Sequence, residues 1–489
     1  MVVQNKVQLI TYPDSLGGDL KNLQLALVKY FPGLFEGGIH ILPPYPSSGD
    51  RGFAPLTYLE IDPQFGTWQD IKRIAEKHAI LLDLMVNHIS AKSTFFQDFI
   101  EHGRASKYAN LFITLDKFWP DGQPLKEDIA KMFLRRAEPF SEFQITESGQ
   151  TEKVWTTFGK TNPSEQIDLD VTSPETRDLF VTFLENFSKN GVEIVRLDAV
   201  GYTIKKRGTS CFFVEPEIYQ FLEWISGEAN SLGIELLPEI HADYQTQYRL
   251  AEKGYWIYDF ILPYTILDTF INRNSKKLLD YLRTRPHNQF TMLDCHDGIP
   301  IKPDLNGLYE SEDARKVVEV CRQRGANFSL ILSPEHKDPD GFDVHQIRGT
   351  IYSLMGCDDA AYFAARAIQL FTPGIPQIYY VGLLAGENDE ASVLRTGEGR
   401  ELNRHNYTHE EIDEQVKRPV VAKLLRLIHF RNSHPAFDGR FTVNETSEQE
   451  ISLTWENDGK QATLFVDLIN NTSVITYSDS NSDKELVFE

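Results

Sequence analysis

The 489-residue sequence contains no apolar run long enough to span a bilayer. Its first residues, MVVQNKVQLITYPD, lack a basic stretch followed by an apolar segment, so no secretory signal is expected there. Only four cysteines occur, and no two of them form a C-x-x-C pair: Cys211, Cys295, Cys321 and Cys357. This scarcity is typical of reduced thiols in a cytoplasmic protein and argues against a disulfide framework or a zinc site.

Positive charge is also scarce. The 49 Lys and Arg residues stand against 71 Asp and Glu residues, which leaves a formal net charge of −22. Such a charge excludes nucleic acid and anionic membranes as expected partners, because both are polyanions. It also repels phosphorylated small molecules, so any phosphate that the protein binds requires a local basic pocket.

Short β-rich apolar runs alternate with amphipathic stretches along most of the chain. The segments 173–191 and 215–233 read as helices, since each opens with Pro-Glu near its first turn and ends at Gly. The near-continuous apolar strands are typical of a parallel sheet that is buried on both faces. The pattern predicts an α/β fold, a (β/α)₈ TIM barrel. Its eight candidate strands are 7–13, 38–44, 80–88, 192–200, 234–241, 256–263, 290–298 and 375–382.

Two connections between these elements are too long for simple loops, and both follow strand ends. We therefore expect two inserted, loop-rich subdomains, residues 89–169 and residues 299–357. Alternating runs near the C-terminus, such as EISLTWEN and QATLFVDL, predict a small antiparallel β domain. The predicted barrel domain comprises residues 1–88, 170–298 and 358–436, and the C-terminal domain residues 437–489.

Polar side chains gather where four of the predicted strands end. They are Asn87 and His88, Arg196 and Asp198, Glu239, and His296 and Asp297. A single such group has a structural interpretation as a buried ion pair, but carboxylates at three strand ends, with two histidines and an arginine, favour a catalytic site.

The stretch VRLDAVGY places Arg196 and Asp198 two residues apart, on one face of a strand. A guanidinium beside Asp198 keeps that carboxylate ionised, as a nucleophile requires. Glu239 follows LLP, an apolar setting that would raise its pKa, as a proton donor requires. Retaining glycoside chemistry uses such a pair of carboxyl groups, about 5 Å apart.

The motifs LMVNH, VRLDAVGY, LLPEIH and LDCHDG resemble, in this order, the four motifs of the α-amylase clan (glycoside hydrolase family 13). The resemblance implies Asp198 as nucleophile, Glu239 as acid/base and Asp297 as transition-state stabiliser. It also implies that Arg196, His88 and His296 contact the nucleophile or the glucosyl hydroxyls. Asn87 matches a calcium ligand of many amylases, but the rest of that site is not found, so no metal is expected.

A narrower resemblance is to the sucrose phosphorylase group, carried by HILPPYPSSGDRGFAP, FGTW, GIPQIYYVGLLAGENDE and ELNRHNY. It implies that Asp50 and Arg404 clamp the far edge of the glucose between Phe53 and Phe158. The alternative for Arg404 is a loop ion pair, and for the two phenylalanines a place in the core. The substrate contacts that this resemblance adds are Tyr202, Asp343 and Gln346.

The acceptor side has two further features. FDVHQ places His345 where sucrose phosphorylases carry tyrosine, and KMFLRRAEPF contains Arg135 beside Arg136. Arginine and histidine are common donors to a phosphomonoester. This pattern resembles phosphorylases of sucrose 6-phosphate, with Arg135 and His345 on the phosphate and Arg136 as the alternative. Arg135 binding inorganic phosphate in a plain sucrose phosphorylase remains the other interpretation.

The resemblance implies a retaining glycosyltransferase that converts sucrose 6′-phosphate and inorganic phosphate into α-D-glucose 1-phosphate and D-fructose 6-phosphate. Its alternatives are sucrose phosphorylase, a glucosylglycerol or glucosylglycerate phosphorylase and, in another class, a non-catalytic amylase-like subunit. Those subunits carry a membrane span and lack the carboxylates retained here. We expect no cofactor, a sugar phosphate and inorganic phosphate as partners, a cytoplasmic location, and a monomer or homodimer.

Overall fold

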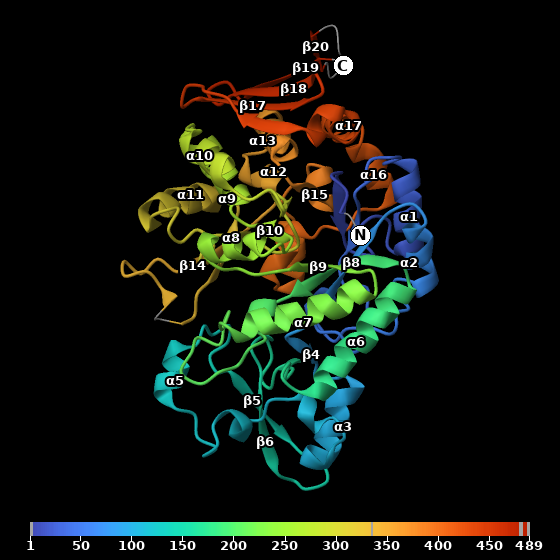
Figure 1. The fold of residues 1–489 in the computed structure, drawn as a ribbon, viewed down its shortest axis with the longest axis vertical. Coiled ribbons are helices and arrows are strands. Elements are labelled where there is room, and N and C mark those ends of the chain that lie inside the picture. Colours follow the sequence, from blue (N-terminus) through green and yellow to red (C-terminus); the bar gives the residue numbers. More distant parts are fainter. Residues whose placement is uncertain (1–2, 334–335, 479–482, 487–489) are drawn as a thin grey trace. The chain divides into compact units, whose positions relative to one another are not determined.

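The computed structural model describes residues 3–333, 336–478 and 483–486. The chain divides into two compact units, each described here by itself. The first unit consists of Ile41–Ile240 with Ile331–Asp343, and the second of Val2–His40, His241–Leu330 and Val344–Glu489. Figure 1 shows the ribbon coloured along the sequence, with the elements labelled.

The first unit contains three parallel strands in the order β3-β8-β9. They are β3 (Ile80–Met85), β8 (Val192–Asp198) and β9 (Glu235–Pro238). Every residue of β3 is buried, as expected for a strand covered on both faces. Met85 pairs with Asp198 in the register of β3 and β8, so the carboxyl ends of the two strands lie side by side at the same end of the sheet.

The second unit contains five strands of the barrel, in the order β10-β11-β15-β1-β2. Parallel pairing joins β10 to β11, β11 to β15 and β15 to β1. These strands are β1 (Gln8–Thr11), β2 (Gly38–Ile41, ending at the unit boundary), β10 (Ile257–Asp259), β11 (Gln289–Thr291) and β15 (Ile375–Tyr379).

Each of the eight strands is followed along the chain by at least one helix. This alternation confirms the predicted (β/α)₈ barrel. The predicted helix over 173–191 begins at Pro174 after Ser173 and ends at Lys189, two residues before Gly191. The helices that follow the strands are α1 (Leu20–Lys29), α2 (Trp68–Ala75), α6 (Pro174–Lys189), α7 (Glu217–Ser231), α8 (Tyr244–Glu252), α9 (Leu262–Asn272), α10 (Lys276–Thr284), α13 (Asp359–Phe371), α14 (Tyr380–Leu383), α15 (Glu390–Thr396), α16 (His409–Gln415) and α17 (Pro419–Ser433).

The first predicted insert, residues 89–169, contains two small antiparallel sheets, β4 with β7 and β5 with β6. Its own apolar cluster includes Trp119, Met132 and Trp155. The boundaries at 88 and 169 stay predictions. The elements are β4 (His88–Ser90), α3 (Thr94–His102), α4 (Leu115–Phe118), α5 (Lys126–Lys131), β5 (Phe140–Gln144), β6 (Thr151–Trp155) and β7 (Gln166–Asp168).

The second predicted insert, residues 299–357, contains a three-stranded sheet in the order β12-β14-β13, and its residues 334–335 lie outside the described residues. Its elements are β12 (Ile299–Pro300), α11 (Ser311–Gln323), β13 (Asn327–Leu330), β14 (Val344–Arg348) and α12 (Ile351–Leu354).

The C-terminal segment forms the predicted antiparallel sheet, drawn in red in Figure 1. Its residues 479–482 and 487–489 lie outside the described residues, as do residues 1–2 of the predicted barrel domain. Across the part of the chain that the structure describes, no helix combines the length and the apolarity that a membrane crossing requires. The strands of this sheet are β16 (Arg440–Val443), β17 (Glu450–Asn457), β18 (Lys460–Asp467), β19 (Thr472–Ser478) and β20 (Asp483–Glu485).

Candidate active site

Strand β8 presents Arg196 and Asp198 on one face at its carboxyl end. Arg196 Nη1 lies 2.9 Å from Asp198 Oδ1, and the side chain of Arg196 is only 4% exposed. A buried guanidinium at this distance favours the ionised carboxylate and restricts its rotation. The R-x-D spacing therefore produces the contact that the sequence predicts.

Glu239 follows β9 directly and lies against the same guanidinium. Arg196 Nη2 is 2.7 Å from Glu239 Oε1, and the backbone N–H of Ala199 donates to Glu239 Oε2 at 2.9 Å. Ala199 has a φ of 52°, a left-handed conformation that is uncommon for alanine. The arrangement corrects one expectation, because Glu239 is held by an ion pair and an N–H donor instead of the apolar setting predicted from LLP.

Asp83 is a third carboxylate on Arg196, and the sequence reasoning missed it. It pairs with Arg196 in the register of β3 and β8, accepts from Arg196 Nη1, and is fully buried. An acid in the middle of the apolar run LLDLMVNH is the signal that was available. The guanidinium of Arg196 thus contacts three carboxylates, which lie on β3, on β8 and directly after β9.

His88 and Phe158 form a wall in the first unit. His88 Nε2 is 2.9 Å from the carbonyl oxygen of Phe53, and its ring lies 5.4 Å from that of Phe158. Burial lowers the pKa of His88, although Asp168 and the Phe53 carbonyl act in the opposite direction. Asp50 lies three residues before Phe53, in the turn that carries it. The predicted residues Asp50, Phe53, His88 and Phe158 therefore come from three segments, joined by the contacts of His88 with Phe53 and Phe158.

Tyr202 extends this wall through aromatic contacts. Its ring lies 5.0 Å from Phe158 and 4.8 Å from Phe212, and it stacks on Phe133 at 6.3 Å. Phe133 and Phe212 were not predicted. The contact of Phe133 with Tyr202 joins segments far apart in the sequence, and no motif marks Phe212, ten residues after Tyr202. A small pocket beside Tyr202 is lined in part by Arg135 and Arg136.

The two adjacent arginines have different surroundings. Arg136 donates from Nη1 to the carbonyl of Phe158 and from Nη2 to that of Thr161, both at 3.0 Å. Partial burial lowers the pKa of Arg136, despite the nearby carboxylates of Glu165 and Asp168. Arg136 therefore holds the loop that carries Phe158.

Asn87, which matches a calcium ligand of many amylases, faces a lysine. Lys205 Nζ lies 2.8 Å from Asp168 Oδ2 and 2.8 Å from Asn87 Oδ1, and its side chain is buried. The ammonium supplies a positive charge to these oxygens, so the residues do not fit a calcium ion. Within residues 3–333, 336–478 and 483–486, no group of three His, Cys, Asp or Glu side chains could hold a metal.

In the second unit, His296 and Asp297 lie in the loop after β11. His296 Nε2 is 3.5 Å from Asp297 Oδ2, and Arg400 Nη2 is 3.2 Å from Asp297 Oδ1. Arg404 donates from Nε and Nη2 to the carbonyl of His296, at 3.0 and 2.9 Å. Arg404 thus supports the loop that bears Asp297, and its contact with glucose stays a prediction.

His345 and Gln346 are neighbours on β14, and both are buried. His345 Nδ1 hydrogen-bonds the carbonyl of Lys302, which orients the imidazole ring. His241 Nδ1 lies 3.2 Å from Asp304 Oδ1. The rings of His241 and His345 meet edge-on, with 6.2 Å between their centroids. Asp343 belongs to the first unit, where its Oδ2 accepts from Lys337 at 2.9 Å.

The structure therefore gathers the predicted residues in each unit separately. The first unit brings together Asp198, Glu239 and Arg196, with the wall of Phe53, His88, Phe158 and Tyr202. The second unit brings together His296, Asp297 and Arg404. The group in the first unit provides two carboxylates, a shared guanidinium and aromatic surfaces, which suit transfer of a sugar.

Comparison with known proteins decides the family. The sequence family described as "Alpha amylase, catalytic domain" matches residues 9–276, more than half of the chain. The chain belongs to the α-amylase family. The resemblance stated from the four motifs is confirmed, and the protein is an enzyme of this family.

Two curated relatives within the α-amylase family match over the full length. A sucrose 6(F)-phosphate phosphorylase of Thermoanaerobacterium thermosaccharolyticum is 61% identical over 484 residues, which cover 99% of each chain. A sucrose phosphorylase of Streptococcus mutans is 42% identical over 492 residues, covering 100% of each.

A solved α-amylase-family structure also matches along the whole chain. It is the crystal structure of sucrose 6F-phosphate phosphorylase from Thermoanaerobacter thermosaccharolyticum. The TM-score is 0.98 at 60% identity, covering 100% of this chain and 99% of that one. The barrel and the C-terminal sheet described above therefore belong to the fold of this family.

Proposed function

We propose that the protein catalyses the phosphorolysis of sucrose 6′-phosphate to α-D-glucose 1-phosphate and D-fructose 6-phosphate, with retention. The observation that carries this proposal is the 61% identity, over 99% of both chains, to a sucrose 6(F)-phosphate phosphorylase. The structural match at a TM-score of 0.98 supports it, and so do the two carboxylates that share Arg196.

In the first step, the carboxylate of Asp198 attacks the anomeric carbon of the glucosyl unit. The bond from this carbon to the bridging oxygen breaks, and Glu239 gives its proton to that oxygen, which leaves as fructose 6-phosphate. The ion pair with Arg196 keeps Asp198 ionised and oriented for attack. Asp297 is proposed to stabilise the positive charge that develops on the sugar ring.

In the second step, an oxygen of inorganic phosphate attacks the same carbon from the opposite face. The ester bond to Asp198 breaks, and Glu239 takes the proton from the attacking phosphate. Two inversions give the α-anomer, so the configuration is retained. Phe53, Phe158 and Tyr202 are proposed to enclose the glucosyl unit and keep water out, with His88, His296, Asp50 and Arg404 on its hydroxyls.

The phosphate on the fructose is proposed to bind Arg135 and His345. A phosphomonoester carries about −1.5 to −2 charges at neutral pH, and the chain has a net charge of −22, so direct cationic contacts are needed. Arg135 lines the small pocket beside Tyr202, and the bond from His345 Nδ1 to the Lys302 carbonyl sets the direction of its other nitrogen. Asp343 and Gln346 are proposed to contact the fructose ring.

Removal of either cationic contact should lower the catalytic efficiency for sucrose 6′-phosphate and spare sucrose. One charge-assisted hydrogen bond contributes about 1.5–3 kcal/mol, which corresponds to roughly 10- to 100-fold. We expect Arg135→Ala to show this loss and His345→Tyr to shift preference toward sucrose. The measurement is the ratio of kcat/KM for the two substrates in each variant.

The control is Arg440→Ala, which removes the same charge as Arg135→Ala. The Arg440 side chain is 78% exposed and lies on the C-terminal sheet. Its ratio should equal that of the parent enzyme. If Arg135→Ala and His345→Tyr both keep the parent ratio, these residues do not bind the fructose phosphate.

The second candidate function is phosphorolysis of unphosphorylated sucrose. The observation in its favour is the sucrose phosphorylase of Streptococcus mutans, 42% identical over the whole chain. In that case Arg135 would bind inorganic phosphate, and its loss would impair sucrose and sucrose 6′-phosphate alike.

The proposed reaction uses no cofactor, and its ligands are a sugar phosphate and inorganic phosphate. A cytoplasmic location, the monomer or homodimer state and the domain boundaries at 88, 169, 298, 357 and 436 stay predictions. Size-exclusion chromatography with light scattering measures the oligomeric state directly.

A further inference from the structure

Residues 399–407, here called the bracing segment, support the loop that carries Asp297. Asn403 Nδ2 donates to the carbonyls of Cys295 and Asp297, at 2.9 and 3.0 Å. Arg404 donates two N–H groups to the carbonyl of His296, between them. Two adjacent side chains of the bracing segment thus satisfy three consecutive carbonyls of the loop. Asn403 and Arg404 are buried, so these bonds are little exposed to competing water.

His405, the next residue, lies between two carboxylates. Its Nδ1 is 3.0 Å from Asp389 Oδ2 and its Nε2 is 3.2 Å from Glu411 Oε1. A carboxylate only accepts hydrogen bonds, so both ring nitrogens must carry a proton to serve both partners. The geometry therefore calls for the imidazolium form. The ring of Tyr407 meets that of His405 edge-on, with 4.7 Å between the ring centroids.

Both carboxylates are anchored independently of His405. Asp389 caps α15 by accepting the backbone N–H of Ser392 at 2.8 Å. Glu411 accepts the backbone N–H of Thr408 at 2.7 Å, in the capping box of α16. Burial opposes ionisation of both acids, but the hydrogen bonds that they accept outweigh it and lower the pKa of each. His405 thus lies between two fixed negative charges.

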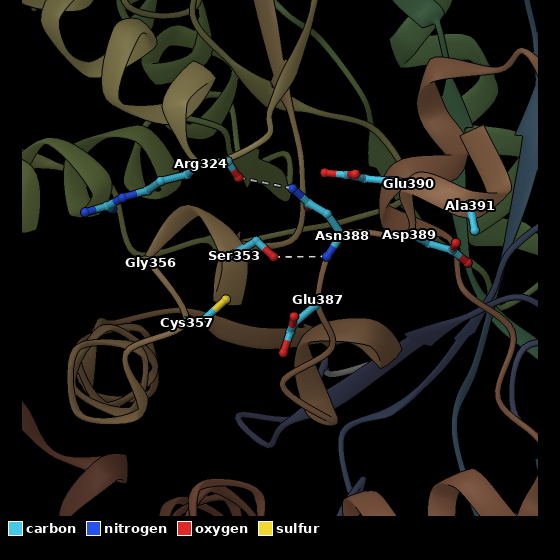
Figure 2. Close-up of a pocket in the computed structure, with 9 residues that line it drawn as sticks. All are labelled: Arg324, Ser353, Gly356, Cys357, Glu387, Asn388, Asp389, Glu390 and Ala391. Carbon is cyan, nitrogen blue, oxygen red and sulfur yellow. Dashed lines mark hydrogen bonds between the residues drawn. The ribbon is translucent and has the colours of Figure 1, made fainter. Parts of the chain in front are cut away.

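The pocket in Figure 2 lies beside this arrangement and contains Asp389. Figure 2 shows the bond from the backbone N–H of Asn388 to Ser353 Oγ, at 2.9 Å. The side-chain oxygen of Asn388 also accepts from the backbone N–H of Thr350, at 2.8 Å. These bonds fix the residue that precedes Asp389. The backbone N–H of Asp389 also donates to the carbonyl of Leu402, at 2.8 Å, in the bracing segment.

We propose that His405, as an imidazolium bridging Asp389 and Glu411, is a positioning residue that sets the place of Asp297 through Asn403 and Arg404. The inference rests on the proposed function for the role of Asp297 in the transition state. His405 itself touches no substrate in this account. Its effect passes through the backbone to Arg404 and from there to the carbonyls of the loop.

The test compares His405→Ala, His405→Gln and His405→Lys in the full-length enzyme. Misplacement of a catalytic group by about 1 Å can cost up to about 100-fold in rate. We therefore expect His405→Ala and His405→Gln to lower kcat for sucrose 6′-phosphate about 10- to 100-fold, with the KM for phosphate nearly unchanged. Lysine carries a cation able to donate to both carboxylates, so His405→Lys should recover most of kcat.

The unchanged KM for phosphate and the recovery of kcat in His405→Lys are readouts that a merely structural role would not give. The control is His429→Ala on α17, an exposed histidine, which should keep the parent kcat.

Urea unfolding of each variant verifies the fold. A folded His405→Ala with the parent kcat would overturn the proposal. A folded His405→Lys as impaired as His405→Ala would overturn the role of the cation. Failure of the proposed function is seen separately, as absence of glucose 1-phosphate release by the parent. In that case the same variants are compared on fluoride release from α-glucosyl fluoride with water as the glucosyl acceptor.

Discussion

Replacement of Asp198 by alanine is expected to reduce phosphorolysis by about 10⁴-fold or more. The glucosyl-enzyme cannot form without this carboxylate, and no other acid at the end of β8 can take its place. The fold should persist, because Arg196 keeps its contacts with Asp83 and Glu239. The measurement is the initial rate of glucose 1-phosphate release, with urea unfolding of the variant beside that of the parent.

A folded Asp198→Ala enzyme that retains a tenth of the parent rate would rule out double displacement through Asp198. A matched control is Asp178→Ala on α6, outside the candidate site, which removes the same group from the same unit. It should keep the parent rate. Mass spectrometry of the parent, quenched during turnover of α-glucosyl fluoride, should detect a glucosyl adduct that Asp198→Ala lacks.

Replacement of Glu239 by glutamine is expected to give a loss that depends on the leaving group. Glutamine preserves the shape and can still accept from the Ala199 N–H, but it cannot donate the proton. General acid catalysis contributes about 10²- to 10⁴-fold, so kcat/KM for sucrose 6′-phosphate should fall within this range. α-Glucosyl fluoride needs no protonation to depart, so its reaction should be impaired far less.

The measurement is the ratio of the two losses, taken as kcat/KM with each donor. Equal impairment with both donors would remove Glu239 from the acid/base role. The ion pair with Arg196 adds a second consequence of this change, because Glu239→Gln also releases one of the three carboxylates on that guanidinium. Loss of this shared charge affects both donors and cancels in the ratio.

Much of the fold and of the candidate site followed from local patterns. Parallel strands buried on both faces read as continuous apolar runs, and a polar residue that interrupts such a run stands out. Arg196, Asp198 and Glu239 were found in this way, because each lies at the carboxyl end of a strand or just after it. Their mutual contact through one guanidinium required only that β8 and β9 be neighbours.

The remainder depends on partners that are distant in the sequence. Lys205 meets Asn87 and Asp168 across the first insert, and no local pattern announces this ion pair. Asp83 interrupts its own apolar run, but that run does not show its pairing with Arg196 on the neighbouring strand. The apolar setting predicted for Glu239 was wrong. The residues that flank Glu239 in the sequence are apolar, but the guanidinium that contacts its carboxylate belongs to Arg196 on the neighbouring strand β8.

The most direct test of the central claim is one comparison in the parent enzyme. Phosphate-dependent release of α-D-glucose 1-phosphate is measured from sucrose 6′-phosphate and from sucrose, at matched concentrations and with phosphate-free controls. Release is expected from both substrates, with kcat/KM about 10-fold or more in favour of sucrose 6′-phosphate, the contribution of at least one charge-assisted hydrogen bond. Equal or greater efficiency with sucrose would contradict the central claim.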